Sequence, residues 1–244
     1  TDDAQDIYNV AFRCAAENGH LAVCQWLTQH FDLGVFDART DNNYALRRAA
    51  TNGHFDVCQW LANHFGLTTE DARSYQNEAL RHAASEGHLE ICQWLIDHFG
   101  LTIEDARTHY NDAILHAARH GHLKVCKYLV ERFSLTSEDI KTENNYAFNY
   151  AAQYGHLEVC RYLAERFSLT EEDIRFSDYK ALCNSACFGH LKVFQWLTQY
   201  FGFTAEDIKR RRILFISANA GHLKICRWIA KQFNLTADDV RIHD

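Results

Sequence analysis

The chain has 244 residues, of which 47% are hydrophobic, and its formal net charge is −7. This apolar content excludes an intrinsically disordered chain, and the negative balance gives no overall electrostatic reason to bind nucleic acid or an anionic membrane. With no apolar run long enough for a membrane span and no visible secretory signal, we expect an intracellular protein, either cytoplasmic or nuclear. Because it starts with Thr1 and contains no Met, we expect it to be part of a longer, multidomain or processed chain.

A Gly-His pair recurs along the whole chain. Its spacing is 34 residues except for the last interval, which is 32 residues. The glycines of the pair are Gly19, Gly53, Gly87, Gly121, Gly155, Gly189 and Gly221. Such a period indicates stacked structural units that cannot bury their apolar faces alone. We therefore expect residues 1–244 to form a single repeat domain of seven units.

Within one unit, two helices are predicted on either side of the Gly-His pair. Residues 78–87 carry Ala79, Leu80 and the following alanines on one face, where small side chains let helices approach closely. This segment is the predicted first helix. Residues 89–99 then place apolar side chains, including Cys92, on one helical stripe with polar residues between them. This segment is the predicted second helix.

The second helix is expected to stop at a residue that tolerates the left-handed conformation. The residues at this position are Asp32, Gly66, Gly100, Ser134, Ser168, Gly202 and Asn234. A Leu-Thr-x-Glu-Asp pattern follows in most units, in which Thr can cap a helix and the acidic residues lie at its positive end. We expect a helical connector of about five to eight residues in each unit.

The pattern AAxxGHLxVCxxL, as at residues 151–163, resembles the ankyrin repeat, and the resemblance covers nearly the whole chain. Two features depart from that family: residues 44–47 read Tyr-Ala-Leu-Arg in place of Thr-Pro-Leu-His, and the connector replaces the β-hairpin finger. The resemblance implies an all-α solenoid of helix-turn-helix repeats with short helical connectors. It also implies a non-enzymatic scaffold that needs no cofactor and binds another protein through a concave surface of first helices and connectors.

Positions at both ends of the first helix vary between units, whereas the predicted core positions are nearly uniform. Variable Tyr, His and Arg side chains are typical of energetically important interface residues. The alternative interpretation is unconstrained drift on a solvated face. The residues predicted to bind the partner are Asn52, Tyr75, Glu86, His109, Tyr110, Arg119, His120, Gln153, Tyr154 and Phe188.

A second functional hypothesis is a nucleic-acid-binding α-solenoid. It would use Arg47, Arg48 and Arg81 of the first helices together with the basic run at residues 209–212. The basic run is interpreted equally as a localisation signal or as a solvated connector. No aromatic residues lie within it, which weakens the nucleic-acid interpretation.

His-x-x-x-Cys occurs in six of the seven units, a spacing that could serve a metal ion or a thiol–imidazole dyad. A site built once would not recur this way, and Phe194 replaces the Cys in the sixth unit. We interpret the Cys as core and the His as a hydrogen-bonding link between repeats. Cys183, Cys187 and His190 share one helical face but lack a fourth ligand, so we expect no metal site and no catalytic residue.

Overall fold

The computed structural model describes the backbone of residues 2–237 and the side chains of residues 9–108, 111–141 and 145–237. The chain divides into two compact units, each larger than a single repeat. From here on, unit 1 means residues 1–117 and 124–135, and unit 2 means residues 118–123 and 136–244. Every regular element of the described backbone is a helix, which confirms the all-α prediction. The single domain over residues 1–244 stays a prediction. None of the helices in the described part has the length and apolar character needed to traverse a bilayer.

First helices, second helices and connectors alternate along the chain, as the repeat predicts. The first helices are α1 (Asp2–Glu17), α4 (Thr40–Thr51), α7 (Ser74–Ser85), α9 (Ile103–Arg119), α11 (Ser137–Gln153), α14 (Lys180–Cys187) and α17 (Ile213–Asn219). The second helices are α2 (Leu21–Phe31), α5 (Phe55–Phe65), α8 (Leu89–Phe99), α10 (Leu123–Arg132), α12 (Leu157–Arg166), α15 (Leu191–Tyr200) and α18 (Leu223–Gln232). Separate connector helices are α3 (Val35–Ala38), α6 (Thr69–Ala72), α13 (Glu171–Phe176) and α16 (Ala205–Arg210). In α9 and α11 the connector and the first helix are continuous.

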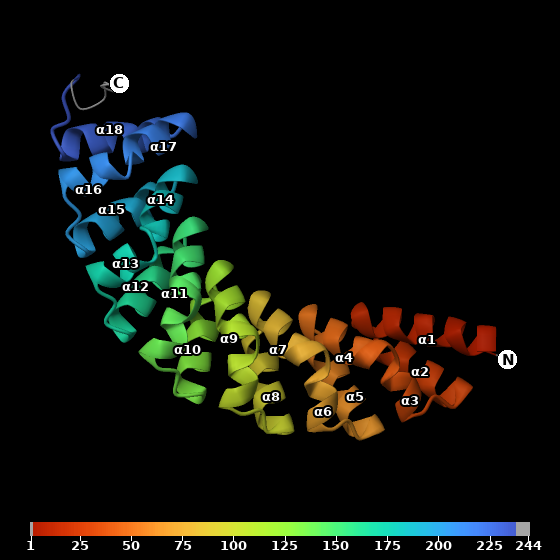
Figure 1. Cartoon of the computed structure of the whole chain (residues 1–244). Coiled ribbons are helices and arrows are strands. Elements are labelled where there is room, and N and C mark those ends of the chain that lie inside the picture. Colours follow the sequence, from red (N-terminus) through yellow and green to blue (C-terminus); the bar gives the residue numbers. More distant parts are fainter. Residues whose placement is uncertain (1, 238–244) are drawn as a thin grey trace. The chain divides into compact units, whose positions relative to one another are not determined.

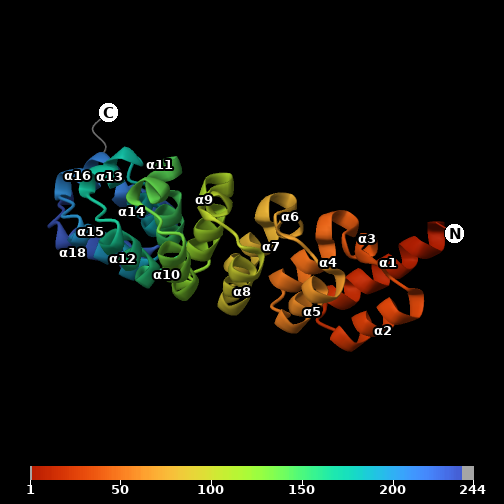
Figure 2. The same ribbon diagram turned by 90° about the horizontal axis from the view of Figure 1, so that it is seen from below.

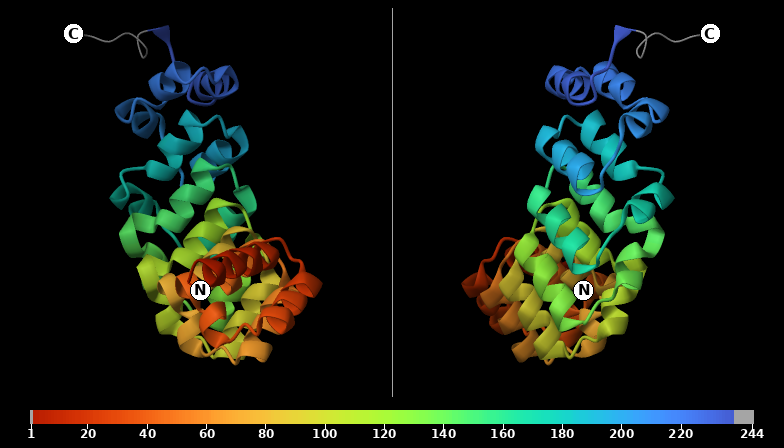
Figure 3. Two further views of the ribbon diagram at one scale, coloured as in Figure 1. Left: turned by 90° about the vertical axis from the view of Figure 1, so that its right-hand side faces the viewer. Right: turned by 90° about the vertical axis from the view of Figure 1, so that its left-hand side faces the viewer.

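Each unit has two layers of helices. In unit 1, α1, α4 and α7 lie side by side, and α2, α5 and α8 form the second layer (Figure 1). The connector helices α3 and α6 pack against α4 and α7 (Figure 2). In unit 2, the layer of α11, α14 and α17 lies against that of α12, α15 and α18, and it can be followed from green to blue in Figure 3. The fully buried pairs Ala49–Ala50 and Ala83–Ala84 permit this close approach of the first helices.

The second helices end as the sequence predicts. All seven residues predicted to adopt the left-handed conformation do so, with φ from 49° at Ser168 to 69° at Gly202. Aromatic side chains also pack between repeats, since Phe12 of α1 meets Phe65 of α5 edge to face with ring centroids 5.8 Å apart. This contact holds one face of α5 against the first helix of the preceding repeat.

The connectors begin as predicted but are shorter than expected at α3 and α6, which have four residues each. At the start of α6, the backbone N–H of Thr68 donates to the Asp71 carboxylate at 2.8 Å, which caps the helix. The connector stops early because Tyr75, Gln76 and Asn77 all have positive φ, of 48°, 62° and 61°. Three successive non-glycine residues in this region are rare, so other contacts must stabilise the turn.

A buried asparagine occupies the last position of this left-handed turn. Asn77 is 3% exposed, and its Nδ2 donates to Thr108 Oγ1 of the next connector at 3.1 Å. Asn43 likewise donates to Ser74 Oγ at 2.7 Å. The asparagines that recur at this 34-residue period are Asn9, Asn43, Asn77, Asn111 and Asn145. Asparagine suits the position because its short polar side chain tolerates positive φ and reaches the neighbouring repeat.

Within unit 1, ion pairs join successive connectors. Arg39 Nε and Nη2 donate to the two carboxylate oxygens of Asp71 at 2.8 and 2.9 Å, and Arg73 pairs in the same way with Asp105. Burial acts to raise the pKa of Asp71 and Asp105, but hydrogen bonds from the arginine and the capping threonine outweigh it and leave each pKa below its ordinary range. One carboxylate thus caps its own connector and fixes the connector before it.

Candidate partner-binding surface

The predicted partner-binding residues lie at the ends of the first helices, as the repeat pattern indicates. Eight of the ten have described side chains, whereas the side chains of His109 and Tyr110 lie outside the described residues. Tyr75 lies in a left-handed turn, just before the regular part of α7. The residues at or just beyond a first-helix C-terminus are Asn52, Glu86, Arg119, His120, Gln153, Tyr154 and Phe188.

Unit 2 brings Arg119 and Tyr154 together around α11. The guanidinium of Arg119 lies 5.1 Å from the ring centroid of Tyr154 and 5.6 Å from that of Tyr150. Arg119 Nη2 also donates to the Tyr154 hydroxyl at 3.0 Å. The rings of Tyr150 and Tyr154 are stacked with centroids 6.4 Å apart. On the same helix, the ring centroid of Tyr146 lies 5.8 Å from that of Tyr150. The result is a row of tyrosines with a cation held over two of them.

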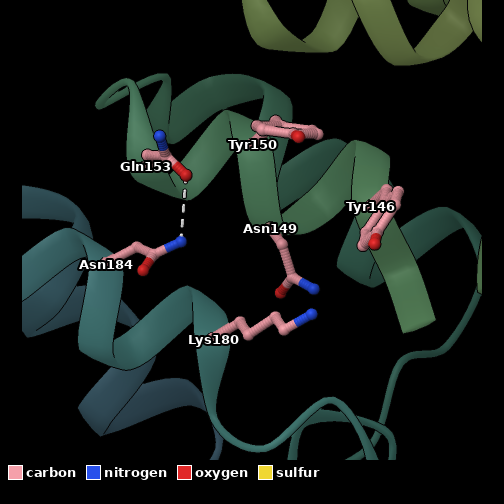
Figure 4. Close-up of a pocket in the computed structure, with 6 residues that line it drawn as sticks. All are labelled: Tyr146, Asn149, Tyr150, Gln153, Lys180 and Asn184. Atoms are coloured by element: carbon pink, nitrogen blue, oxygen red, sulfur yellow. Dashed lines mark hydrogen bonds between the residues drawn. The ribbon is translucent and has the colours of Figure 1, made fainter. Parts of the chain in front are cut away.

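A pocket of 260 Å³ lies beside this row, between α11 and α14 (Figure 4). Gln153 and Asn184 join across it by a 3.0 Å hydrogen bond from Asn184 Nδ2 to Gln153 Oε1. Lys180 extends beneath Asn149 toward Tyr146, with its Nζ 5.3 Å from the Tyr146 ring centroid. The residues that line the pocket are Tyr146, Asn149, Tyr150, Gln153, Lys180 and Asn184.

The remaining predicted residues do not gather around one pocket. Tyr75 is 57% exposed, and the guanidinium of Arg47 lies 4.5 Å from its ring centroid. Asn52 links two first helices of unit 1, because its Nδ2 donates to the carbonyl oxygen of Glu17 at 2.7 Å. Phe188 is 50% exposed just after α14. The predicted set therefore holds one cluster in unit 2 and several separate surface positions.

Of the residues that line the pocket, only Gln153 belongs to the predicted partner-binding set. Sequence reasoning missed Asn149, Tyr150 and Asn184 entirely. Sequence variation between repeats drew attention to the ends of the first helices, whereas these three residues lie in helix interiors. The four-residue spacing of Tyr146, Tyr150 and Tyr154 places all three on one helical face and could have identified the row.

The arginines of the nucleic-acid hypothesis are engaged within the protein. Arg47 is 7% exposed and donates to the carbonyl oxygens of Asp41 and Asn42, each at 2.8 Å, and it pairs with Glu78. Arg81 forms a 2.8 Å ion pair with Asp112. Arg47 thus stabilises the left-handed turn before its own helix, a role that the sequence did not predict.

In the basic run, Arg211 is also engaged within the protein. Its guanidinium pairs with Asp178 and lies 4.5 Å from the ring centroid of Tyr179. Arg212 occupies the left-handed position before α17, with φ of 53°, and its guanidinium lies 5.1 Å from the ring centroid of Phe215. At least these two side chains therefore have structural contacts within unit 2.

The recurring His and Cys occupy structural positions. His88 Nε2 lies 3.0 Å from the carbonyl oxygen of Thr51 in the preceding repeat, which matches the predicted link between repeats. Cys92 and Cys126 are fully buried, and burial raises the pKa of each thiol to about 12. Among the described residues, no group of three or more His, Cys, Asp or Glu side chains is arranged to hold a metal ion.

Comparison with known proteins agrees with the repeat geometry. The chain matches the family model described as ankyrin repeats (3 copies) over residues 12–106 and 103–175. It is similar in structure to an ankyrin repeat family protein from Legionella pneumophila, with 17% identity, a TM-score of 0.48, and coverage of 94% of this chain and 74% of that chain. No curated protein sequence matches it. Since the family model spans well over half of its length, the chain belongs to the ankyrin-repeat family.

Proposed function

We propose that the chain is a non-enzymatic scaffold that binds another protein through the exposed surface of its first helices and connectors. Ankyrin repeats are generally protein–protein interaction modules. The observation that carries the proposal for this chain is the cluster of Arg119, Tyr150 and Tyr154 in unit 2, with the exposed Phe188 on the neighbouring α14. Tyr and Arg are among the side chains most enriched at the positions that dominate binding energy.

The cluster is suited to binding because its side chains are already held in place. Arg119 is fixed by its hydrogen bond to the Tyr154 hydroxyl and by two ring contacts. Ordering a free, rotamer-rich side chain at an interface costs about 0.5–1.5 kcal/mol, and a side chain that is already fixed avoids part of this cost. The second helix of the same repeat instead exposes Glu158 and Glu165, which are residues depleted at interfaces.

The nucleic-acid alternative gains no support from the contacts of the first-helix arginines. Arg47 and Arg81 are committed to carboxylates and to backbone carbonyls of their own turns. Withdrawing them to contact phosphates would leave the left-handed turns without these hydrogen bonds. The protein-binding proposal relies instead on side chains such as Tyr154 and Phe188, which are 38% and 50% exposed.

The proposal also places the protein inside the cell. All nine cysteines are free thiols, and five of them, including Cys58 and Cys160, are buried. Free thiols in this number are typical of a reducing compartment. Localisation of a tagged full-length protein in cells tests this part, and secretion into the medium would contradict it.

Affinity capture with matched variants tests the binding surface. The double variant Tyr154→Ala with Phe188→Ala truncates side chains that are 38% and 50% exposed on the first-helix side of unit 2. The control, Tyr200→Ala with Leu223→Ala, truncates side chains that are 44% and 58% exposed on second helices of the same unit. We expect the first variant to lose partners that the wild-type protein and the control both retain. Equal recovery with both variants would count against the surface.

A further inference from the structure

Apart from residues 137–144 of α11, the first-helix segments of unit 2 and the turns that follow them contain no acidic residue, although the whole chain carries a net charge of −7. No Asp or Glu occurs in residues 118–123, 145–157, 180–190 or 213–222. In unit 1 the corresponding surface carries Glu17, Glu78 and Glu86. The cations within these four segments therefore have no acidic residue in the same segment.

Two cations on this surface have no carboxylate within salt-bridge distance among the described residues. They are Arg119 and Lys180, and they flank the tyrosine row of α11. Elsewhere Arg39, Arg73 and Arg81 each hold a carboxylate at 2.8 Å. Arg119 and Lys180 both contact tyrosine rings instead, and Arg119 also donates to the Tyr154 hydroxyl, so both can still receive an anion.

The pocket beside Lys180 fits one side chain better than a separate small molecule. Its volume of 260 Å³ lies below the range of about 300–1,000 Å³ that is typical of small-molecule sites. Its polar groups are the ammonium of Lys180 and the amides of Asn149, Gln153 and Asn184, all of which can donate hydrogen bonds to a carboxylate. The rings of Tyr146 and Tyr150 provide its apolar wall.

We propose that the tyrosine row of α11, together with Lys180 and Arg119, binds an extended acidic peptide segment of the partner protein. One Asp or Glu side chain enters the pocket and meets Lys180 and the amides. A second acidic side chain pairs with Arg119, and apolar side chains of the segment cover Tyr150 and Tyr154. This inference rests on the proposed function and adds the chemical class of the partner.

Selection of displayed random peptides on the whole protein tests this inference. The variant Lys180→Glu reverses the charge at the pocket, and Lys192→Glu makes the same charge change at an exposed position on α15 of the same unit. Circular dichroism and thermal unfolding of both variants verify the fold. Wild-type protein should enrich peptides rich in Asp and Glu, and Lys180→Glu should abolish that enrichment while Lys192→Glu retains it.

Affinities of one enriched peptide give the decisive numbers. We expect about a tenfold or larger loss of affinity with Lys180→Glu, a comparable loss when the peptide's acidic residues become Gln or Asn, and near wild-type binding with Lys192→Glu. Peptides without acidic bias whose binding still requires Tyr150 and Tyr154 would overturn the acidic specificity and leave the proposed function standing. Peptides insensitive to both Lys180→Glu and Tyr150→Ala, or no selected peptides at all, would overturn the inference, and insensitivity would also count against the proposed surface.

Discussion

His156 lies directly against Gly121 of the preceding repeat. Its Nε2 is 2.9 Å from the carbonyl oxygen of Arg119, and a Cβ built on Gly121 would lie 2.4 Å from its Nδ1. Burial lowers the pKa of His156, so the ring is neutral at pH 7 and can donate its Nε2 proton to that carbonyl. The Gly-His period therefore has a steric cause, because the glycine of one repeat makes room for the histidine of the next.

Replacing Gly121 should be more damaging than replacing a glycine that has only the positive φ. Gly121 has φ of 81° and the His156 ring against it, whereas Gly202 has φ of 69° and nothing within 4 Å. We expect Gly121→Ala to lower the free energy of unfolding by about 3 kcal/mol or more and Gly202→Ala by about 1 kcal/mol. Urea unfolding of both variants measures the difference, and equal losses would show that the ring contact is unimportant.

The carboxylates that cap the connectors predict a loss of stability in acid. Burial acts to raise the pKa values of Asp71, Asp105, Asp173 and Asp207, but hydrogen bonds and charge pairing leave each below the ordinary value of 3.8. A carboxyl with a lowered pKa stabilises the folded state fully above its unfolded pKa, and this contribution disappears as the pH falls through the folded pKa. Unfolding free energies should therefore be flat near neutrality and fall steeply below the ordinary value of 3.8.

Asp105→Asn provides the test of this assignment. It removes the charge that pairs with Arg73 while keeping one oxygen to accept a hydrogen bond, so it should cost about 1–3 kcal/mol at neutral pH. The variant should also lose less stability than the wild-type protein on acidification. An unchanged acid profile would mean that Asp105 does not contribute to it.

The cysteines should fall into two reactivity groups. Cys14 and Cys187 are exposed, whereas Cys92 and Cys126 are buried and their thiol pKa is raised to about 12. Because the thiolate is the reactive form, a thiol-specific reagent should modify the exposed pair rapidly in the folded protein. The buried thiols should react only on unfolding. Mass spectrometry of modified peptides assigns the sites, and rapid native modification of Cys92 would contradict the core assignment.

The asparagines that recur at the 34-residue period should be important for stability. Asn77 combines a φ of 61° with a hydrogen bond from its side chain to Thr108 of the next connector. Asn77→Ala loses both the tolerated conformation and the bond, so we expect a loss of about 2–3 kcal/mol. Asn77→Gly keeps the conformation and loses only the bond, with an expected loss of about 1 kcal/mol. Thermal or urea unfolding distinguishes the two, and equal stability of both variants would contradict this account.

The sequence predicts those parts of the fold that depend on neighbouring residues. The second helices and their left-handed ends follow from apolar spacing and from residues such as Gly100. The left-handed turn at residues 75–77 was missed because its stabilising contacts come from elsewhere. Asn77 bonds to a residue 31 positions away, and Arg81 must reach back to the turn carbonyls.

A substitution at the position of the recurring asparagines hides the role of that position in unit 2. Tyr179 stands where the first five repeats have Asn, with φ of 57°, and its hydroxyl lies 3.3 Å from Asp207 Oδ1. The long side chain of Tyr179 and the short side chain of Asn77 thus both bond to the next connector. The residue types alone do not reveal that the two positions have the same role. For the surface, the helix-end residues Arg119 and Tyr154 were predicted, whereas Tyr150 was missed because it lies inside α11.

Hydroxyl-radical footprinting of the complex shows whether a partner covers the first-helix surface of unit 2. In the free protein the exposed side chains of Tyr154, Phe188, Tyr200 and Leu223 should all be oxidised. On addition of a captured partner, Tyr154 and Phe188 should become protected while Tyr200 and Leu223 on the second helices stay reactive. Protection of Tyr200 and Leu223 with Tyr154 and Phe188 still reactive would contradict the proposed binding surface.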